Sequence, residues 1–512
     1  MRFLIDAKQI RTVSMLMISS LLLFSVGCDD DLTGPLNSND RSAVTAEAGS
    51  GNYYAGNLVS DDYYPGTEQH GVLSYNDFVN TEDDNLSTFG VDVDAGSYTF
   101  GRKKINEGII PSPSSVRVEE YINYFRQEYP QPTEGPFSVS LDGAPSPFRG
   151  DSLHLLRIGL QGQAPSETGA PWNITFLIDV SGSMGSRMNL VKNSLYILVD
   201  NMRQSDKISI CTYASATETI LNPTGLEEID AQSVKDIIAE LTAGGSTAMG
   251  SGLQNAYDVN NLGHMENGVN RVIVCSDGDA NVGGTSHEAI LELIDEYVDQ
   301  GITLSTLGYG SGNYNDLMME QLADQGNGNY YYIDSEEEAR RLFTEEISGL
   351  MEVIAKDVKI QVEFNPASVK RYRLIGYENR DIADEEFEND STDTGDIGAG
   401  HRVTALYELE INLESSSEFG TVHLRYKLPQ GETDIPMDVE IRHMYFADDI
   451  ADASDRFKFT AAVAEYAEIL RESPHVSSTL AEVETLMAAS LNGSDDRDAE
   501  VLELLRALQT ID

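Results

Sequence analysis

Three short motifs together supply two carboxylates and several hydroxyls, and each lies at the end of a predicted strand or in a loop before a predicted helix. The run ITFLI ends in Asp179-Val180-Ser181-Gly182-Ser183, a loop holds Gly244-Gly245-Ser246-Thr247, and RVIVC ends in Ser276-Asp277-Gly278. Open α/β sheets bind ligands at the carboxyl ends of their strands, so we expect these side chains to meet. Oxygen donors without His or Cys suit a hard cation such as Mg²⁺. The candidate metal ligands are Asp179, Ser181, Ser183, Thr247 and Asp277.

Residues 171–354 contain the elements that must position these motifs. Apolar β-like runs alternate there with segments of helical periodicity, and the expected helices cover residues 188–202, 229–241, 253–259, 286–300 and 335–350. The strand segments are ITFLIDV, KISICTYA, RVIVCSD, ITLSTLGYG and NYYYID. Apolar strands interleaved with helices are typical of a parallel sheet covered on both faces. The sequence therefore predicts an α/β domain with a doubly wound, mostly parallel sheet.

The chain on either side of this domain has a different pattern. Residues 75–170 predict an N-terminal α+β region, whose helices and strands are expected at 97–107, 115–125 and 137–160. Period-two alternation predicts an antiparallel β domain over 355–446, and helical periodicity predicts three C-terminal helices within 447–512. The β-rich segments on the two sides are similar in character. We hypothesise that they pair into one sandwich into which the α/β domain is inserted.

The first 27 residues are typical of a secretory signal peptide. Arg2, Lys8 and Arg11 precede an apolar stretch over 13–26, which is too short to be expected to span a membrane. Cys28 follows Gly27 directly, and this junction resembles the lipobox of bacterial lipoproteins, in which the Cys becomes the lipidated first residue. Ser25 stands where that family prefers an aliphatic residue. We expect lipid attachment at Cys28, with an ordinary signal peptide as the alternative.

Residues 28–74 are rich in Ser, Asn, Gly and Asp and predict an acidic, polar tether. The whole chain has 512 residues, with 85 acidic side chains against 34 basic ones, and a formal net charge of −51. Such a surface repels phosphate backbones, which argues against nucleic-acid binding. Three cysteines are too few for a disulfide framework, and Cys211 and Cys275 lie in apolar runs that predict burial.

The order D-x-S-x-S, then Thr, then Asp resembles the metal-ion-dependent adhesion site (MIDAS) of von Willebrand factor type A (VWA) domains. Asp179, Ser181, Ser183, Thr247 and Asp277 match that pattern position by position. The resemblance implies that the hydroxyls coordinate the metal directly and the carboxylates act directly or through water. It also implies that one metal position is left for a carboxylate of a protein partner.

Longer segments are similar to bacterial VWA lipoproteins of the YfbK type. They include STFGVDVDAGSY, RVEEYINYF, GGSTAMGSGLQNAYD, NRVIVCSDGDANVG and RLIGYENR, and the resemblance runs from about residue 85 to at least 409. It implies the strand order 3-2-1-4-5-6 for the α/β domain. Cys211 and Cys275 would then lie on strands either side of the central strand, too far apart for a disulfide.

These observations favour a lipid-anchored, divalent-metal-dependent protein-binding module that is not an enzyme. Mg²⁺ is the expected ion, with Ca²⁺ and Mn²⁺ as alternatives, and the expected partner is an envelope or extracellular protein that offers a carboxylate. No small-molecule substrate is evident. Export through the signal peptide would leave the protein attached to a membrane, facing the periplasm or exposed on the cell surface.

Two alternatives stay open. A metal-dependent hydrolase would use the same cation, although no histidine falls in the three motif loops and Ser181 and Ser183 would be occupied by the metal. A structural scaffold of the cell envelope could bind Ca²⁺ through the acidic segment 379–400. That segment lacks the spacing of an EF-hand loop, and we expect a flexible, solvated loop there.

Overall fold

The computed structural model describes residues 70–511 apart from 72, 151, 167–168, 279–286, 311–313, 413–414, 416, 432, 492 and 494. Cys28, the signal peptide and all but the last few residues of the tether lie outside the described residues. Within the described ranges, no helix has the length and apolar character needed to cross a membrane.

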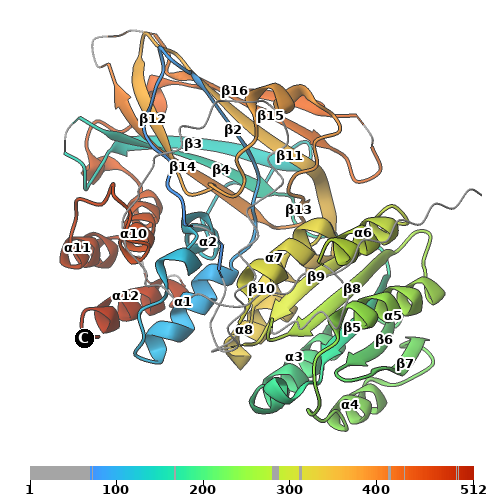
Figure 1. Ribbon diagram of the computed structural model, residues 1–512. Helices are drawn as coiled ribbons and strands as arrows, with labels where there is room; N and C mark the ends of the chain where they lie inside the picture. The colour runs from blue at the N-terminus through green and yellow to red at the C-terminus, as the bar shows by residue number, and fades with distance from the viewer. Residues whose placement is uncertain are drawn as a thin grey trace, which may run out of the picture. The chain divides into compact units, whose positions relative to one another are not determined.

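The central α/β domain is built on a six-stranded sheet with the order β10-β9-β8-β5-β6-β7 (Figure 1). Its strands are β5 (Trp172–Asp179), β6 (Lys207–Tyr213), β7 (Thr217–Gly225), β8 (Val269–Ser276), β9 (Ile302–Gly308) and β10 (Tyr330–Tyr332). Numbered along the domain, this is the expected order 3-2-1-4-5-6. All neighbours are parallel except β7, which is antiparallel to β6. The sequence pattern does not single out β7, because this edge strand is half exposed and contains Pro223.

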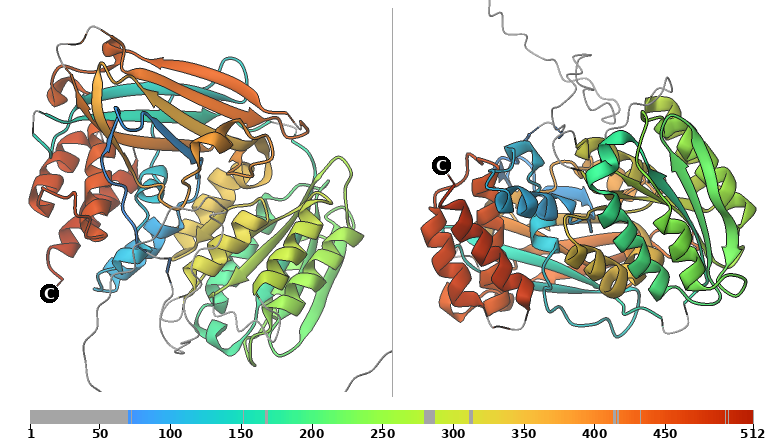
Figure 2. Two further views of the ribbon diagram at one scale, coloured as in Figure 1. Left: turned by 45° about the horizontal axis from the view of Figure 1, so that its top comes forward. Right: turned by 90° about the horizontal axis from the view of Figure 1, so that it is seen from below.

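Helices cover both faces of this sheet. One face packs against α3 (Met188–Asn201), α4 (Ala231–Ala239), α8 (Glu336–Arg340), a π-helical turn (Arg341–Glu346) and α9 (Ile347–Met351). The other packs against α5 (Met249–Leu262), α6 (His287–Val298) and α7 (Asp316–Gln325). Helix α7 is absent from the sequence-based prediction. Figure 2 shows the helices on either side of the strands.

The two described cysteines lie on β6 and β8, the strands that flank β5. Cys211 packs into the apolar core on one face of the sheet and Cys275 into the core on the other. Both thiols are buried and free. Their opposite directions, in addition to the strand between them, prevent a disulfide.

A β-sandwich is assembled from both sides of the central domain. One sheet has the order β1-β12-β14-β4-β3, and the second has β13-β11-β15-β16 with β2 also paired to β11. The strands are β1 (Val79–Asn80), β2 (Leu86–Gly90), β3 (Phe137–Pro145), β4 (His154–Gly162), β11 (Val353–Phe364), β12 (Val369–Ile375), β13 (Ile397–Gly398), β14 (Arg402–Ile411), β15 (Gly420–Lys427) and β16 (Ile435–Ile441). The central domain enters between β4 and β11, while β4 pairs directly with β14. Side chains of both sheets share one apolar core.

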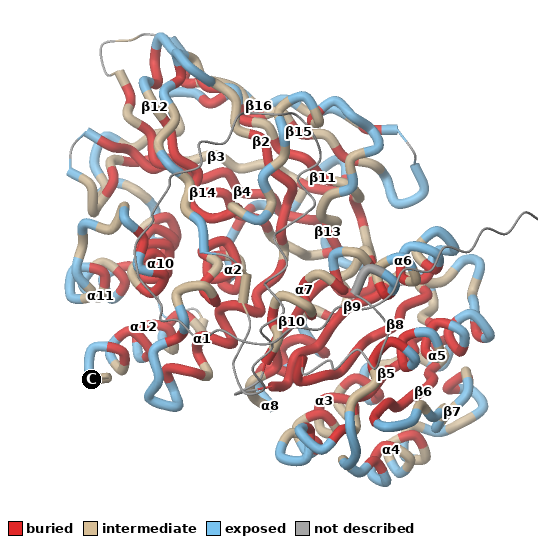
Figure 3. Tube along the Cα trace, in the orientation of Figure 1, coloured by how far each residue is buried: buried red, intermediate tan, exposed pale blue. Residues whose placement is uncertain are grey.

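The helices outside the central domain share a further core. Helices α1 (Gly96–Asn106) and α2 (Val118–Asn123) pack with α10 (Asp455–Leu470), α11 (Leu480–Ser490) and α12 (Asp496–Leu508). The sequence predicts an amphipathic α1, but this helix is buried almost all round (Figure 3). Its Tyr98 and Ile105 enter the shared core, and its Phe100 packs against the central domain. Short 3₁₀ turns occur at Pro113–Ser115, Gly182–Ser186, Asp384–Glu388, His443–Tyr445 and Ile450–Asp452.

The acidic segment 379–400 is not the free loop that its composition predicts. Its Ile397 is buried and lies in β13, which pairs with β11. The backbone N–H of Val358 donates to the carbonyl of Gly395 (3.0 Å), and Lys359 Nζ donates to the carbonyl of Asn389 (2.6 Å). Apolar anchors and hydrogen bonds to β11 therefore outweigh the solvation of the many acidic side chains.

Leu156 on β4 tests the shared core of the sandwich. Its side chain is 0% exposed, so Leu156→Ala should lower the free energy of unfolding by about 2–5 kcal/mol. Leu428, in the same sandwich, is 46% exposed and serves as the matched control, with an expected change within about 0.5 kcal/mol. Urea unfolding followed by circular dichroism measures both. Equal, small losses would contradict the packing described for β4.

Candidate metal site

The first motif begins at the carboxyl end of β5, the strand at the centre of the sheet. Asp179 is the last residue of β5 and is fully buried, and Ser181 is buried two residues later. Ser183 is exposed and lies in the 3₁₀ turn that leads into α3. The motif thus runs from the core of the domain to its surface within five residues.

Asp179 is held by hydrogen bonds from two of the motifs. Its Oδ1 accepts the backbone N–H of Ser181 at 2.8 Å, and its Oδ2 accepts the hydroxyl of Ser276 at 3.1 Å. Ser276 Oγ in turn accepts the backbone N–H of Gly278 at 3.1 Å. The hydrogen bond between Asp179 and Ser276 therefore joins the end of β5 to the end of β8. Asp277, which lies between Ser276 and Gly278, is buried at the same place.

The Gly-rich loop before α5 is tied to the first motif through backbone hydrogen bonds. The N–H of Gly182 donates to the carbonyl of Gly245 (3.1 Å), and the N–H of Gly244 donates to the carbonyl of Val180 (2.7 Å). Gly245 has φ +93°, a conformation that suits glycine. Thr247 follows, half-buried, just before α5. The three motif loops therefore converge at the carboxyl edge of the sheet.

The side chains at this edge form a set of oxygen donors. The hydroxyls of Ser181 and Ser183 lie 3.0 Å apart. Burial raises the pKa of Asp179 to about 6, the negative charge of Asp277 adds to this rise, and hydrogen bonds from Ser181 and Ser276 oppose it. Two carboxylates in a partly desolvated place, together with neutral hydroxyls, fit a hard divalent cation.

The donor set differs from a carboxylate-rich calcium site. Within the described part of the chain, no group of three or more His, Cys, Asp or Glu side chains is arranged to hold a metal ion. Any cation here would be held by Asp179 and Asp277 with the hydroxyls of Ser181, Ser183 and Thr247. Because hydroxyl ligands are neutral, such a cation would keep much of its positive charge for a further anionic ligand.

Comparison with known proteins identifies the parts of the chain. The von Willebrand factor type A domain model matches residues 173–345, a von Willebrand factor model matches 64–157, and the model described as "Uncharacterized protein YfbK, C-terminal" matches 349–416 and 410–511. The protein YfbK of Escherichia coli (strain K12) is 35% identical over 478 residues, which cover 88% of this chain and 82% of that one. The chain belongs to the YfbK-like VWA family. The central α/β domain is its VWA domain.

Other relatives match shorter lengths of the chain. The inter-alpha-trypsin inhibitor heavy chain H3 of Homo sapiens is 26% identical over 206 residues, which are 38% of this chain and only 22% of that protein. Among solved structures, a von Willebrand factor type A protein from Catenulispora acidiphila aligns with a TM-score of 0.44 at 16% identity. That alignment covers 75% of this chain and 91% of the other.

Ser276 is a residue of the site to which the sequence assigns no role. It joins Asp179 to the Asp277 turn, and its place directly before Asp277 in the strand-end motif is the signal that could have found it.

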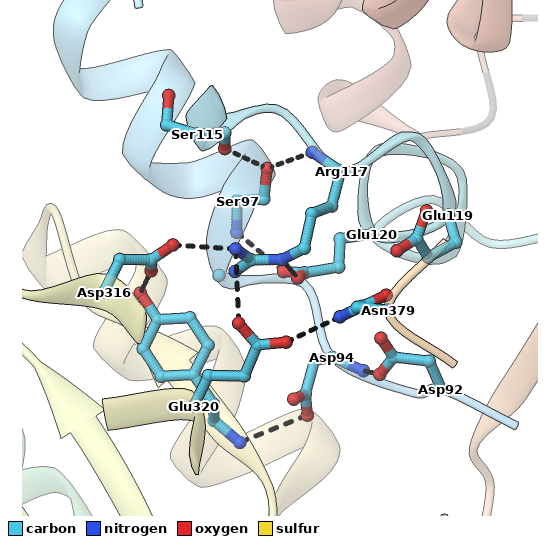
Figure 4. Close-up of polar contacts among 12 residues, drawn as sticks. Asp92, Asp94, Ser97, Ser115, Arg117, Glu119, Glu120, Asp316, Glu320 and Asn379 are labelled. Atoms are coloured by element: carbon cyan, nitrogen blue, oxygen red, sulfur yellow. Dashed lines mark hydrogen bonds and ion pairs between the residues drawn. The ribbon is translucent and has the colours of Figure 1, made fainter. Parts of the chain in front are cut away.

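A second group of charged residues, which the sequence does not single out at all, lies where the N-terminal region meets the VWA domain. There, buried carboxylates from both sides lie around Arg117 and Arg380; they are Asp92, Asp94, Glu119, Glu120, Asp316 and Glu320, and Figure 4 shows them with Arg117.

This second group has more carboxylates than arginines, so the negative charges are not fully balanced and the pKa values of some of its carboxylates are raised. Burial raises the pKa of Glu119 to about 7, and the neighbouring charges of Glu378 and Asp92 add to the rise. Glu119 Oε2 accepts the backbone N–H of Tyr377 at 3.0 Å, which partly opposes it. Burial likewise raises the pKa of Glu320 to about 7.

The raised pKa of Glu119 predicts a pH-dependent stability. The folded protein binds this proton more tightly than the unfolded chain, so its contribution is complete below about pH 4.5 and is lost as the pH rises through about 7. The melting temperature should therefore fall between pH 5.5 and pH 8.5, and Glu119→Gln should make this fall smaller. Glu337→Gln, at an exposed position on α8, should leave it unchanged. Equal pH dependence in both variants would refute this assignment.

Proposed function

We propose that this protein is a membrane-anchored, non-enzymatic binding module that captures a carboxylate of a partner protein through a divalent cation. The observation that carries the proposal is the convergence of Asp179, Asp277 and the Gly-rich loop at the carboxyl edge of the VWA sheet. Mg²⁺ is the proposed ion, and Ca²⁺ and Mn²⁺ have compatible chemistry. VWA domains in general mediate binding between proteins, which supports this choice.

The surroundings of the proposed site favour a protein partner over a small molecule. The two loops that carry Ser183 and Thr247 also contain small, exposed residues beside these ligands; they are Gly185, Ser186, Gly244 and Ser246. Small side chains leave the site open to a broad surface. Because the chain carries a net charge of −51, the partner should not be strongly negative around the carboxylate that it offers.

A hydrolase would need a general base beside the metal ligands. No histidine falls in the three motif loops, and His264 follows α5 beyond the far end of that helix. Asp179 and Asp277 are the carboxylates of the site itself. The arrangement therefore supports binding rather than bond cleavage.

Metal binding is the first test of the proposal. Asp179→Asn keeps the shape of the side chain and one oxygen that can accept the N–H of Ser181, but it removes the negative charge and the acceptor for the hydroxyl of Ser276, and Asp277→Ala removes the second carboxylate. Each should weaken Mg²⁺ binding by more than the roughly 10- to 100-fold that loss of an outer-shell partner costs. Isothermal titration calorimetry measures the affinity. Asp236→Ala, at an exposed position on α4, is the control. Unchanged Mg²⁺ affinity in Asp179→Asn would refute the metal site.

The same variants test capture of a partner. Pull-downs from solubilised cell envelope should retain a protein in Mg²⁺ and release it in EDTA, and Asp277→Ala should not retain it. A partner that is held equally well in EDTA would show that binding uses another surface.

We also propose that Cys28 carries the membrane anchor, as its position after Gly27 at the end of the apolar segment suggests. Cys28→Ala should move the protein from the membrane fraction to the soluble fraction and abolish labelling by a radioactive fatty acid. Cys211→Ala, which changes a buried thiol on β6, should do neither. Membrane association that persists in Cys28→Ala would rule out a lipid anchor at this residue.

A further inference from the structure

The Asp277–Gly278 turn packs tightly against two other places in the VWA domain. Gly278 has φ +72°, and a Cβ added to it would lie 2.7 Å from the backbone nitrogen of Asn315. A Cβ added to Gly310 would lie 2.8 Å from the carbonyl oxygen of Asp277. Real Cβ atoms do not approach so closely, so the turn has no room to move toward either neighbour. The position of Asp277 therefore depends on where Gly310 and Asn315 are held.

Gly310 is held by the N-terminal region. Its carbonyl accepts a hydrogen bond from Lys103 Nζ at 3.0 Å and another from the hydroxyl of Tyr332. Lys103 lies in the last turn of α1 and also contacts the hydroxyl of Tyr332 at 3.1 Å. A side chain from outside the VWA domain thus shares with Tyr332 in holding the first of the two neighbours.

Asn315 is held through the residue that follows it. Its side chain caps α7 by accepting the N–H of Met318 at 3.1 Å. Asp316, the first residue of α7, accepts Arg117 Nη1 at 2.7 Å and the hydroxyl of Tyr330 at 2.5 Å. Figure 4 shows Arg117 reaching from the N-terminal region to Asp316 and Glu320 on this helix. An arginine from outside the VWA domain therefore shares with Tyr330 in holding the segment that carries the second neighbour of the Asp277 turn.

Helix α1, which carries Lys103, packs closely against the VWA domain. Phe100 of α1 enters an aromatic cluster with Tyr314, Tyr330 and Tyr332 of the VWA domain. A Cβ added to Gly96 would lie 2.3 Å from the ring of Tyr330, so α1 approaches that ring as closely as only glycine permits. A displacement of α1 would therefore be passed to Gly310 rather than absorbed between the two parts.

We propose that the N-terminal region regulates the metal site by setting the position of Asp277, with Lys103 and Arg117 as the positioning residues. This inference rests on the proposed function of the site. The coupling is reciprocal: ligand binding at Asp277 stabilises the docked N-terminal region, and loosening that region weakens binding at Asp277. Lys103 and Arg117 act through Gly310 and Asn315 and do not themselves bind the cation.

Two variants test the coupling, and both leave the metal ligands unchanged. Lys103→Met removes the donor to Gly310. Arg117→Lys keeps the charge among Glu120, Asp316 and Glu320 but loses the planar fork that reaches them together. Arg126→Met is the matched control, because Arg126 also joins the N-terminal region to the VWA domain, through Glu345, but away from the Asp277 turn. Melting temperatures establish that each variant is folded.

The first measurement is amide hydrogen exchange of the metal-free protein. The N–H of Tyr309 donates to the carbonyl of Ser276 (2.9 Å) and the N–H of Gly278 to its hydroxyl, so both amides report on the turn. Lys103→Met and Arg117→Lys should speed exchange at these two amides, whereas Arg126→Met should not. Lys103→Arg, which restores a donor, should restore slow exchange. Unchanged exchange in both test variants overturns the coupling, whatever the protein binds.

The second measurement is Mg²⁺ titration of the same proteins. Lys103→Met and Arg117→Lys should weaken Mg²⁺ binding by about 5- to 150-fold, the usual range for coupled sites. If all variants bind Mg²⁺ as tightly as the parent, the coupling fails while the metal site stands. If the parent itself does not bind Mg²⁺, the proposed function fails, and the exchange data still decide whether Lys103 and Arg117 position the turn.

Discussion

The burial of one carboxylate, Asp179, is the constraint on which the site depends. Removing a carboxylate from water costs several kcal/mol unless hydrogen bonds or opposite charges replace the water. Here the replacements come from the N–H of Ser181 and the hydroxyl of Ser276, one from the loop after β5 and one from the end of β8. A single buried group thereby joins the two central strands at their carboxyl ends. The raised pKa of Asp179 shows that these hydrogen bonds do not compensate its burial fully, which leaves a favourable role for a cation.

The central strands and the convergence of the three motif loops could be predicted from the sequence because both depend on local signals. Continuous apolar runs such as RVIVC are typical of strands buried on both faces, and each motif follows its strand directly. Strand β7 and helix α7 lack such signals. β7 is an edge strand with alternating exposure, and α7 reads as DLMMEQLADQ, in which acidic side chains interrupt the apolar stripe. Strand β7 forms because it pairs with the edge of the sheet, and α7 forms because it packs on the core. Both contacts involve residues distant in sequence, which a short stretch of sequence does not show.

The long-range contacts of Arg117 could not be predicted, since they join residues about 200 positions apart. Its ion pairs with Asp316 and Glu320 exist only because the N-terminal region folds onto α7. The acidic segment 379–400 is a similar case: its composition indicates solvation, but burial of Ile397 and the hydrogen bond from Lys359 hold it against β11. In both places, charged residues that the sequence predicts to be on the surface pack between two parts of the fold: the N-terminal region and α7 in the first case, and segment 379–400 and β11 in the second.

Many of the chain's arginines are buried together with the carboxylates that they bind. The chain has only 34 basic side chains. Pairs of Arg102, Arg149, Arg373 and Arg471 join different parts of the structure. Pairs of Arg157, Arg341 and Arg456 lie within one sheet, one helical segment and the C-terminal helices. Arginine suits this role because its planar fork binds carboxylates in pairs while remaining charged. Each of these arginines is paired with a carboxylate that is itself buried or partly buried, so the pairs take charges of both signs off the surface and leave its net charge strongly negative. An anionic group of a partner is therefore repelled over most of the molecule. The neutral serines and glycines of the two loops beside Asp179 are a place where such a group can approach, which makes a bound cation there decisive for where the partner binds.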